Sequence, residues 1–375
     1  MKTLRTVILC LLAASLASAQ SVVDVDGRKV RVRIEGSGSP AVVFESGFSD
    51  SMNPWAAVFP EVAKMTRAFA YDRAGLGQSE ASPAPRSYRA IVSELHKVLE
   101  HEKVAPPYVL VGHSYGGALT RVFAATYPAE VAGIVFVDPM TEDLLAKDRA
   151  ATGKIIAEED ERLKNAPPGI RAEWQALRGE ALSDYPLLRA VPKPNVPMTL
   201  LISRVDHPEG WVAAEMSRYA PWIEERDDSS MVLTSNSTHY IQRDEPQLVI
   251  AAIRSMLYPN PIGVLDRTMR AKGADATVAA FRDMQKRYPA GSITPPLLNT
   301  LGYSQLRQKH VDDAIRFFAL NVEMFPGDAN AYDSLGEAYA VKGDREEALE
   351  NYRKSLAMDP KNDNARRQIA KLEKM

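Results

Sequence analysis

Cysteine is nearly absent from this chain, which has a single one, Cys10, among 375 residues. It lies in an N-terminal segment that we expect to be cleaved. Without it the chain has no disulfide, no catalytic cysteine and no cysteine-ligated metal site. The length exceeds one typical domain, so two domains are expected. The hydrophobic content of 45% and charged content of 25% are ordinary for a globular protein.

A large net charge and a hydrophobic run that could span a membrane are also lacking. The net charge is −2, and loss of Lys2 and Arg5 with residues 1–19 brings it to −4, which gives no reason to expect nucleic acid or anionic membranes as partners. The apolar run Val7–Ala17 is about 11 residues long, whereas a span needs roughly 20. With Ala17-Ser18-Ala19 behind it, the run predicts a signal peptide over residues 1–19. We therefore expect export to the periplasm or medium, with no membrane span after cleavage.

Beyond this segment, short apolar runs alternate with amphipathic stretches. Asp26-Gly27 joins two β-branched runs and predicts a hairpin. Buried strands are predicted at residues 40–47, within 67–79, and at 108–112, 133–139, 196–203 and 230–235. Helices are predicted near residues 54–65, within 87–103, and at 115–127 and 245–257. This alternation predicts an α/β fold with a mostly parallel sheet and the hairpin at one edge.

Two stretches interrupt the alternation. Residues 140–195 are charged, amphipathic and rich in proline, which predicts a helical insertion. The stretch YPNPIG, residues 258–263, is a proline-rich break and the predicted domain boundary. We therefore expect an α/β domain over residues 20–260 and a second domain over residues 261–375.

The second domain contains an internal repeat with a period of 34 residues, over residues 295–328 and 329–362. The positions that agree are Leu301-Gly302 with Leu335-Gly336, Ala314 with Ala348, Phe318 with Tyr352, and Pro326 with Pro360. The pattern resembles tetratricopeptide repeats, which are helix pairs, and implies an all-α domain. Residues 264–289 fit a partial repeat and residues 364–372 a capping helix. Because two repeats bury little surface, we expect them to pack on the first domain or on a second copy of the chain, and a protein partner is a further possibility.

The stretch VLVGHSYGG, residues 109–117, places Ser114 among glycines between a predicted strand and a predicted helix. This is the form of a nucleophile elbow, a turn in which the serine takes strained backbone angles and its neighbours lack room for side chains. The turn lifts the hydroxyl to the helix N-terminus, where the Tyr115 N–H can stabilise an oxyanion. A phosphate-binding loop is the other interpretation, but no Gly-Lys-Ser/Thr follows and no acidic residue lies in a ribose-binding position.

Three motifs together resemble the α/β-hydrolase superfamily, over residues 22–258. ESGFSD resembles its oxyanion segment, YDRAGLGQS its D-R-x-G-x-G-x-S loop, and VGHSYGG its elbow. The resemblance implies that the Phe48 N–H is the second oxyanion donor, although many relatives have His-Gly where this chain has Ser46-Gly47. It also implies that Asp72 and Arg73 brace the oxyanion loop, with a solvated ion pair as the alternative.

Six histidines compete for the role of the base that activates the serine. His239 lies in the loop after the last strand, at the C-terminal edge of the sheet, as the order Ser…Asp…His of the superfamily requires. His207 follows a strand end and is the alternative base. His113 lies inside the elbow and is expected to point away from the hydroxyl. The histidines expected at helical or surface positions are His96, His101 and His310.

The base needs a carboxylate to orient it, and two aspartates qualify. Asp206 follows the strand MTLLIS, where the superfamily usually has its acid, and it is the preferred candidate. Asp138 follows the preceding strand, IVFVD, and some relatives use that position instead. A turn or capping role before Pro139 is the alternative for Asp138.

The residues and the resemblance together predict an α/β-hydrolase sandwich whose insertion caps the site, and a serine hydrolase that works through an acyl-enzyme without a metal or cofactor. Small-molecule carboxylic esters are the expected substrates, and amides, peptides or lactones are the alternatives. A function of another class is a peptide-binding repeat module on an inactive hydrolase scaffold. The cap residues considered as pocket-lining are Trp174, Leu177, Leu182, Tyr185 and Leu187, for which helix packing is the alternative role.

Overall fold

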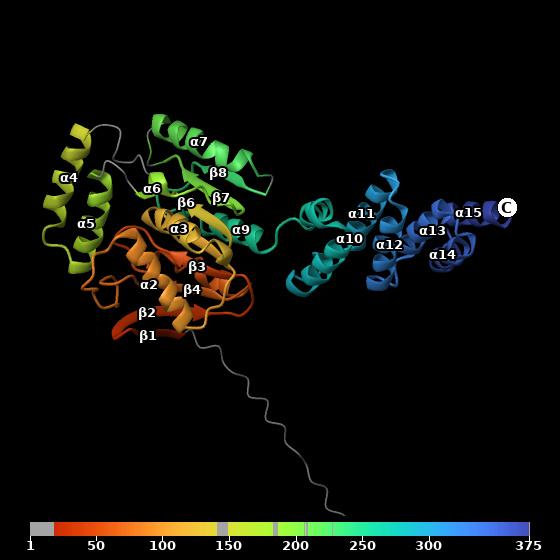
Figure 1. The fold of residues 1–375 in the computed structure, drawn as a ribbon, viewed down its shortest axis with the longest axis horizontal. Helices are drawn as coiled ribbons and strands as arrows, with labels where there is room; N and C mark the ends of the chain where they lie inside the picture. Colours follow the sequence, from red (N-terminus) through yellow and green to blue (C-terminus); the bar gives the residue numbers. More distant parts are fainter. Residues whose placement is uncertain are drawn as a thin grey trace, which may run out of the picture. The chain divides into compact units, whose positions relative to one another are not determined.

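The computed structural model describes residues 19–140, 149–182, 187–205, 207, 209–226 and 228–374 (Figure 1). The chain divides into two compact units, Met1–Leu257 and Tyr258–Met375, so the division falls where the proline-rich break begins. Apart from Ala19, the predicted signal peptide lies outside the described residues. Each unit has its own hydrophobic core.

The first unit is built on a sheet that has eight strands within the described residues, in the order β1-β2-β4-β3-β5-β6-β7-β8. The strands are β1 (Ala19–Val25), β2 (Arg28–Glu35), β3 (Ala41–Glu45), β4 (Ala68–Tyr71), β5 (Tyr108–His113), β6 (Val131–Val137), β7 (Met198–Ser203) and β8 (Ser230–Thr234). Strand β2 pairs antiparallel with both β1 and β4, and all other pairings are parallel. This confirms the predicted α/β fold with a mostly parallel sheet.

Local sequence accounts for the two kinds of strand. Asp26 and Gly27 have φ angles of 54° and 77°, the left-handed conformation that a tight hairpin turn needs, and the hairpin β1–β2 lies at the sheet edge as predicted. Strands β3, β5 and β7 are buried at every residue, which explains their unbroken apolar sequences. Their carboxyl ends meet at one edge of the sheet, where the loops that carry chemistry emerge.

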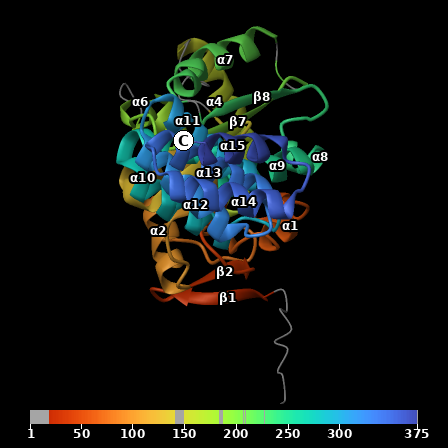
Figure 2. The ribbon, with the colours of Figure 1, turned by 90° about the vertical axis from the view of Figure 1, so that its right-hand side faces the viewer.

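Helices cover both faces of this sheet (Figure 2). Helices α2 (Tyr88–His101) and α3 (Tyr115–Thr126) pack on one face, and α1 (Phe59–Ala63) and α9 (Pro246–Leu257) on the other. The apolar positions that predicted α2 are its buried face, which includes Ile91, Leu95, Val98 and Leu99. The connecting segments contain the short helices η1 (Asn53–Trp55), η2 (Pro128–Glu130) and α8 (Ile241–Asp244), and α7 (Glu209–Glu224) joins β7 to β8.

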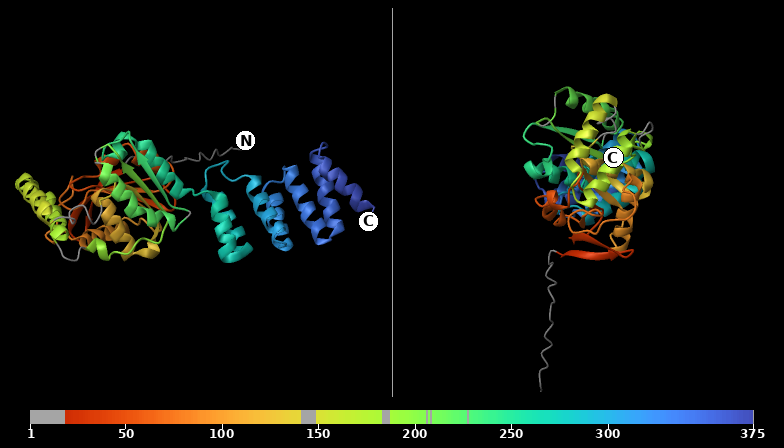
Figure 3. Two further views of the ribbon diagram at one scale, coloured as in Figure 1. Left: turned by 90° about the horizontal axis from the view of Figure 1, so that it is seen from above. Right: turned by 90° about the vertical axis from the view of Figure 1, so that its left-hand side faces the viewer.

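The predicted insertion between β6 and β7 is helical. It contains α4 (Arg149–Leu163), α5 (Pro168–Leu182) and α6 (Leu187–Ala190). Helices α4 and α5 pack together around Ile156, Leu163 and Trp174, and in Figure 3 they are the yellow-green pair at one end of the first unit. This pair is the cap that the sequence predicted.

One stretch of the described chain, Pro246–Arg287, is long and apolar enough to cross a membrane by length and composition. In the structure it forms two helices, α9 and α10 (Pro261–Arg287). In α9 the side chains of Val249, Ile250 and Ile253 are buried, and the helix packs on β5, β6 and β7. Core packing therefore accounts for the apolar character of α9.

The second unit is all-helical. Its helices after α10 are α11 (Pro295–Arg307), α12 (Val311–Met324), α13 (Ala329–Lys342), α14 (Arg345–Met358) and α15 (Asp363–Glu373), each packed on the next (Figure 3). A Cβ on Gly302 would lie 2.4 Å from the Phe318 ring, and one on Gly336 would lie 3.0 Å from the Tyr352 ring. The repeated glycine therefore makes room for the repeated aromatic residue.

Candidate active site

Ser114 stands at the turn between β5 and α3, with φ 50° and ψ −117°. These angles are strained for a residue with a side chain, as the sequence predicted for a nucleophile elbow. The turn is crowded: a Cβ on Gly116 would lie 2.2 Å from the carbonyl oxygen of Glu45, and one on Gly117 would lie 2.7 Å from Pro139. The glycines are therefore required by close backbone approach.

Backbone hydrogen bonds hold this turn beside the end of β6. The Ser114 N–H donates to the Val137 carbonyl at 3.1 Å, and the Ser114 carbonyl accepts from the N–H groups of Gly117 and Met140, both at 2.9 Å. Val137 and Met140 lie on either side of Asp138 in the chain. The elbow and Asp138 are thus fixed next to each other by main-chain contacts.

Among the described residues, Asp138 places its carboxylate against His239. The Nδ1–H of His239 donates to Asp138 Oδ2 at 2.6 Å, and the Ser203 N–H donates to Asp138 Oδ1 at 2.9 Å. Asp138 is 1% exposed. Burial alone would raise its pKa, but hydrogen bonds from His207, His239 and Ser203 outweigh burial and hold the pKa below the usual 3.8. The group is therefore a carboxylate at neutral pH.

The sequence favours Asp206 for this role and ranks Asp138 second. Asp206 lies outside the described residues, so the carboxylate that the structure describes beside His239 is the second candidate and not the first. Both follow strands that are neighbours in the sheet, β6 and β7, so both are consistent with the same chain order of triad residues.

His239 lies between β8 and α8, at the C-terminal edge of the sheet, as predicted. Its carbonyl oxygen accepts a 2.9 Å hydrogen bond from Nε2 of His113, the residue next to Ser114, and the two imidazole centroids are 4.7 Å apart. Burial and the charge of His239 lower the pKa of His113 to about 3, so His113 is neutral at neutral pH. Its Nε2 thus links the His239 loop to the elbow.

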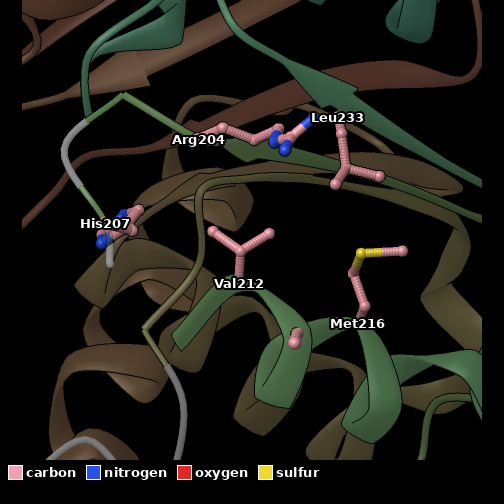
Figure 4. A pocket seen from close by; sticks show the side chains of 6 residues that line it. Arg204, His207, Val212, Met216 and Leu233 are labelled. Atoms are coloured by element: carbon pink, nitrogen blue, oxygen red, sulfur yellow. The ribbon is translucent and has the colours of Figure 1, made fainter. Parts of the chain in front are cut away.

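A second imidazole contacts the same carboxylate oxygen. His207 Nε2 donates to Asp138 Oδ2 at 2.8 Å, and the His207 ring stacks on Trp211 with a centroid distance of 3.6 Å. His207 also borders a pocket of about 520 Å³ between the ends of β7 and β8 and helix α7. Its lining combines the cation Arg204 with apolar side chains, of which Val212, Met216 and Leu233 are labelled in Figure 4.

The remaining histidines, His96, His101 and His310, lie in a helix or at its first turn, as expected. His96 on α2 stacks on Tyr127 at 3.9 Å and contacts Glu130. His101 contacts Glu102 at the end of the same helix, and His310 belongs to the repeat unit. Within the described part of the first unit, neither His96 nor His101 contacts Asp138.

The segment that carries Phe48 is braced by Arg73, as the resemblance implied. The Arg73 guanidinium donates to the carbonyl oxygens of Ser46 and Gly47 at 2.7 and 2.6 Å. Asp72 supports the next part of the loop, because its Oδ1 accepts from the Met52 N–H at 2.8 Å. The alternative of a solvated ion pair is wrong, since Asp72 and Arg73 are at most 1% exposed.

Arg73 also forms buried ion pairs with two glutamates. One is Glu45 at the end of β3, at 2.7 Å, and the other is Glu173 on the cap helix α5, at 2.5 Å. Burial raises the pKa of Glu45 despite the nearby arginine, while the charges of Glu173 and Glu45 overcome the effect of burial and raise the pKa of Arg73 well above its usual value. A single cation thus joins the sheet, the oxyanion loop and the cap.

The proposed oxyanion donors belong to neighbouring residues. Tyr115 is the first residue of α3, where helix N–H groups have no acceptor within the helix. Its fully buried ring lies edge-on to the Phe48 ring at 6.4 Å. Phe48 is also covered by Trp174 of the cap, with a centroid distance of 6.2 Å.

The described cap residues that were considered as pocket-lining are packed inside the fold. Trp174 is 6% exposed and donates its Nε1–H to Asp160 at 2.7 Å, and Leu177 packs on the same cluster. Leu187 packs on the main core. These contacts favour the helix-packing interpretation for all three residues. The Leu182 side chain and Tyr185 lie outside the described structure.

Two contacts around the candidate site are not expected from the sequence. Glu173 lies in a charged, amphipathic stretch whose glutamates resemble solvated surface residues, and its partner is 100 positions away. The sequence presents His207 as an alternative base and not as a second donor to the acid. The sequence feature that could have predicted the contact of His207 with Asp138 is its position just after a strand end, next to Asp206.

The sheet, the covering helices and the elbow define an α/β hydrolase. The chain belongs to this family, since the model of the alpha/beta hydrolase fold matches residues 40–259, more than half of the chain. The tetratricopeptide repeat model matches residues 329–362, the second of the predicted repeats. Both resemblances inferred from the sequence are thereby confirmed.

Among curated proteins, the chain is similar to the uncharacterized protein YqjL of Bacillus subtilis (strain 168), with 30% identity over 224 residues, 58% of this chain and 84% of YqjL. It is also similar to an AB hydrolase superfamily protein of Gibberella zeae, with 35% identity over 107 residues, 28% of this chain and 33% of that protein.

Two solved structures share the fold. The epoxide hydrolase CorEH without ligand has a TM-score of 0.50 at 17% identity, over 64% of this chain and 99% of that one. A putative lipase (lip1) from Acinetobacter baumannii AYE has a TM-score of 0.51 at 18% identity, over 64% of this chain and 90% of that one. At these identities the likeness concerns the fold alone.

Proposed function

We propose that this protein is an exported serine hydrolase that cleaves carboxylic esters of small molecules. The observation that carries the proposal is the 2.6 Å contact between His239 and the buried Asp138, next to a serine held at φ 50° in a nucleophile elbow. These are the parts of a Ser-His-Asp triad. The acid in this proposal is Asp138, the second candidate from the sequence.

In this mechanism the Ser114 hydroxyl attacks the ester carbonyl while His239 Nε2 takes its proton. Since His239 Nδ1–H donates to Asp138, the ring is fixed in the tautomer whose Nε2 carries the lone pair. The Asp138 carboxylate then stabilises the imidazolium. His239 gives the proton to the leaving alcohol, and an acyl-enzyme remains.

The negative charge that develops on the carbonyl oxygen would be stabilised by the N–H groups of Phe48 and Tyr115. Arg73 supports this by fixing the carbonyls of Ser46 and Gly47 just before Phe48. Water then attacks the acyl-enzyme with His239 as base and restores Ser114. Preorganised donors of this kind commonly contribute roughly 10²- to 10³-fold in kcat each.

Amides, peptides and lactones are the alternative substrates, because the same triad attacks all of these carbonyls. Epoxide opening, the activity named for one structural neighbour, is disfavoured because the elbow of this chain carries a serine. In the inactive-scaffold alternative the repeats alone would act, by binding a protein. The contact between the buried Asp138 and His239 favours an active hydrolase over an inactive scaffold.

The test is labelling with a fluorophosphonate probe, followed by a panel of esters, aminoacyl amides and lactones of graded size. We expect the probe to modify Ser114 in the folded protein, and Ser114→Ala to lose both labelling and hydrolysis. If the folded wild type forms no adduct at Ser114, the proposal that the protein is a serine hydrolase is wrong. Faster turnover of aminoacyl amides than of esters would refute the substrate class alone.

Export and partner binding are further parts of the proposal. We expect the mature protein recovered outside the cytoplasm to begin at Gln20, as peptide mass mapping can show. We also expect the repeat unit to bind a protein or a second copy of the chain. A full-length chain that is monomeric and captures no protein in cross-linking would contradict the second expectation.

A further inference from the structure

The two histidines on Asp138 bring three metal-binding atoms together. They are Asp138 Oδ2, His207 Nε2 and His239 Nδ1, which all lie within 4.8 Å of one another. Two of the separations are 2.6 and 2.8 Å, from Asp138 Oδ2 to the two imidazole nitrogens. Ligands of tetrahedral Zn²⁺ lie about 3.3 Å apart, so a small widening of this cluster would admit the ion.

The chemistry of the ligands selects among metals. Two imidazoles and one carboxylate suit Zn²⁺, Cu²⁺ and Ni²⁺, whereas Mg²⁺ and Ca²⁺ prefer oxygen ligands. The cluster is also accessible, because the side chains of His207 and His239 are 18% and 35% exposed while that of Asp138 is 0% exposed. An ion can therefore arrive from solvent at the two imidazoles and meet a buried charge behind them.

We propose that Asp138, His207 and His239 form an inhibitory site for Zn²⁺ and similar divalent ions. The inhibitory part rests on the proposed function, since it uses the triad. Binding takes the lone pairs of His239 Nδ1 and His207 Nε2, and each ring keeps one proton on its other nitrogen, so no proton is gained or lost. His239 Nε2 then carries a hydrogen and cannot accept the proton of Ser114.

His207 is what separates this cluster from an ordinary triad. Without His207, this cluster would offer a metal ion only the two ligands Asp138 and His239, and two ligands bind an ion weakly. With it, a third ligand is held in place by the stacking of His207 on Trp211. The stacked ring is oriented toward Asp138 before any ion arrives, and such preorganisation favours binding.

The experiment uses full-length protein freed of metal with a chelator, and ZnCl₂ and MgCl₂ as the probes. We expect Zn²⁺, and not Mg²⁺, to abolish hydrolysis of a small activated ester, and excess chelator to restore it. His207→Gln keeps an N–H donor for Asp138 but loses the imidazole ligand. It should weaken zinc inhibition by about 100-fold or more, since even loss of an outer-shell partner costs roughly 10- to 100-fold in metal affinity. His101→Gln, at an exposed histidine, is the matched control and should resemble the wild type.

Calorimetric titration with ZnCl₂ measures binding without any activity. One site in the wild type that is lost in both His207→Gln and His207→Asn would support the proposal. No zinc binding by the wild type, or equal binding by the His207 variants, would overturn it. If the wild type hydrolyses nothing, the proposed function fails, while the titration still decides whether the metal site exists.

Discussion

The substitution Asp138→Asn tests the triad most directly. The carboxylate accepts three hydrogen bonds, one at Oδ1 from Ser203 and two at Oδ2 from His207 and His239. Asparagine has one oxygen, and if this stays on the Ser203 N–H, its amide N–H groups face both imidazoles. His239 can then keep its hydrogen bond to residue 138 only by moving its proton from Nδ1 to Nε2, where it blocks proton transfer from Ser114.

The magnitude follows from this loss of the correct tautomer. In a serine triad the same change lowers kcat by about 10⁴-fold, which corresponds to about 5 kcal/mol of transition-state stabilisation. Substrate binding does not use this carboxylate, because it is buried behind the histidines. We therefore expect kcat to fall by about this factor with little change in KM.

The assay is steady-state ester hydrolysis by the wild type, Asp138→Asn and Asp206→Asn, with thermal unfolding to confirm that each variant folds. Asp206→Asn is the matched control, since it removes a carboxylate that follows the neighbouring strand. If Asp206→Asn loses turnover while Asp138→Asn keeps it, Asp206 is the acid and the assignment of Asp138 is wrong.

The same variant should change how stability depends on pH. Because the folded pKa of Asp138 lies below 3.8, its ionised form stabilises the fold above that pH, and this contribution disappears as pH falls through the folded pKa. Lowering the pH should therefore reduce the free energy of unfolding of the wild type by more than it reduces that of Asp138→Asn. Denaturant unfolding at pH 7 and below pH 3.8 measures the difference.

Three further substitutions test the packing around the site and in the repeats. Glu173→Gln removes a buried charge from the cap and should cost about 3 kcal/mol of stability and lower kcat more than it raises KM, as measured by thermal unfolding and ester kinetics. Gly116→Ala places a Cβ 2.2 Å from the Glu45 carbonyl oxygen and should cost about 1–3 kcal/mol, with reduced turnover in the same assays. Gly302→Ala places a Cβ 2.4 Å from the Phe318 ring and should lower the melting temperature of the repeat unit with kcat unchanged.

Each of these substitutions has a matched control on the same chain. Glu158→Gln changes an exposed glutamate of α4, and Gly153→Ala and Gly327→Ala add a Cβ that meets nothing within 4 Å. The controls should retain stability and activity. If Glu173→Gln behaves as Glu158→Gln does, the ion pair with Arg73 does not brace the cap. If Gly116→Ala and Gly302→Ala leave stability unchanged, the steric argument for these glycines is wrong.

The sequence was informative where a local pattern determines geometry. The glycines around Ser114 predicted the elbow because a sharp turn leaves no room for side chains, and the repeated glycine and aromatic residues predicted the helix pairs. The position of His239 after the last strand predicted that it lies at the sheet edge. In each case neighbours in sequence create the constraint.

The sequence was less informative where distant segments meet. Asp138 and Asp206 follow adjacent parallel strands, so position along the chain cannot tell which carboxylate turns toward His239. Glu173 resembled a surface residue because its amphipathic helix carries many charges, and only folding brings it against Arg73. Such a contact depends on how the cap helices pack on the sheet, and the spacing of residues along the chain does not predict that packing.

The ion pair between Arg73 and Glu173 also constrains how the cap can vary. In a helix each added residue rotates the later residues by about 100° around the axis, so one insertion in α5 before Glu173 would aim its carboxylate away from the arginine. Loops outside this helix can change length without that effect. New substrate pockets on this scaffold should therefore arise by substitution of side chains on α5 and by length changes in the flanking loops. Residue 173 should stay on the side of α5 that faces Arg73.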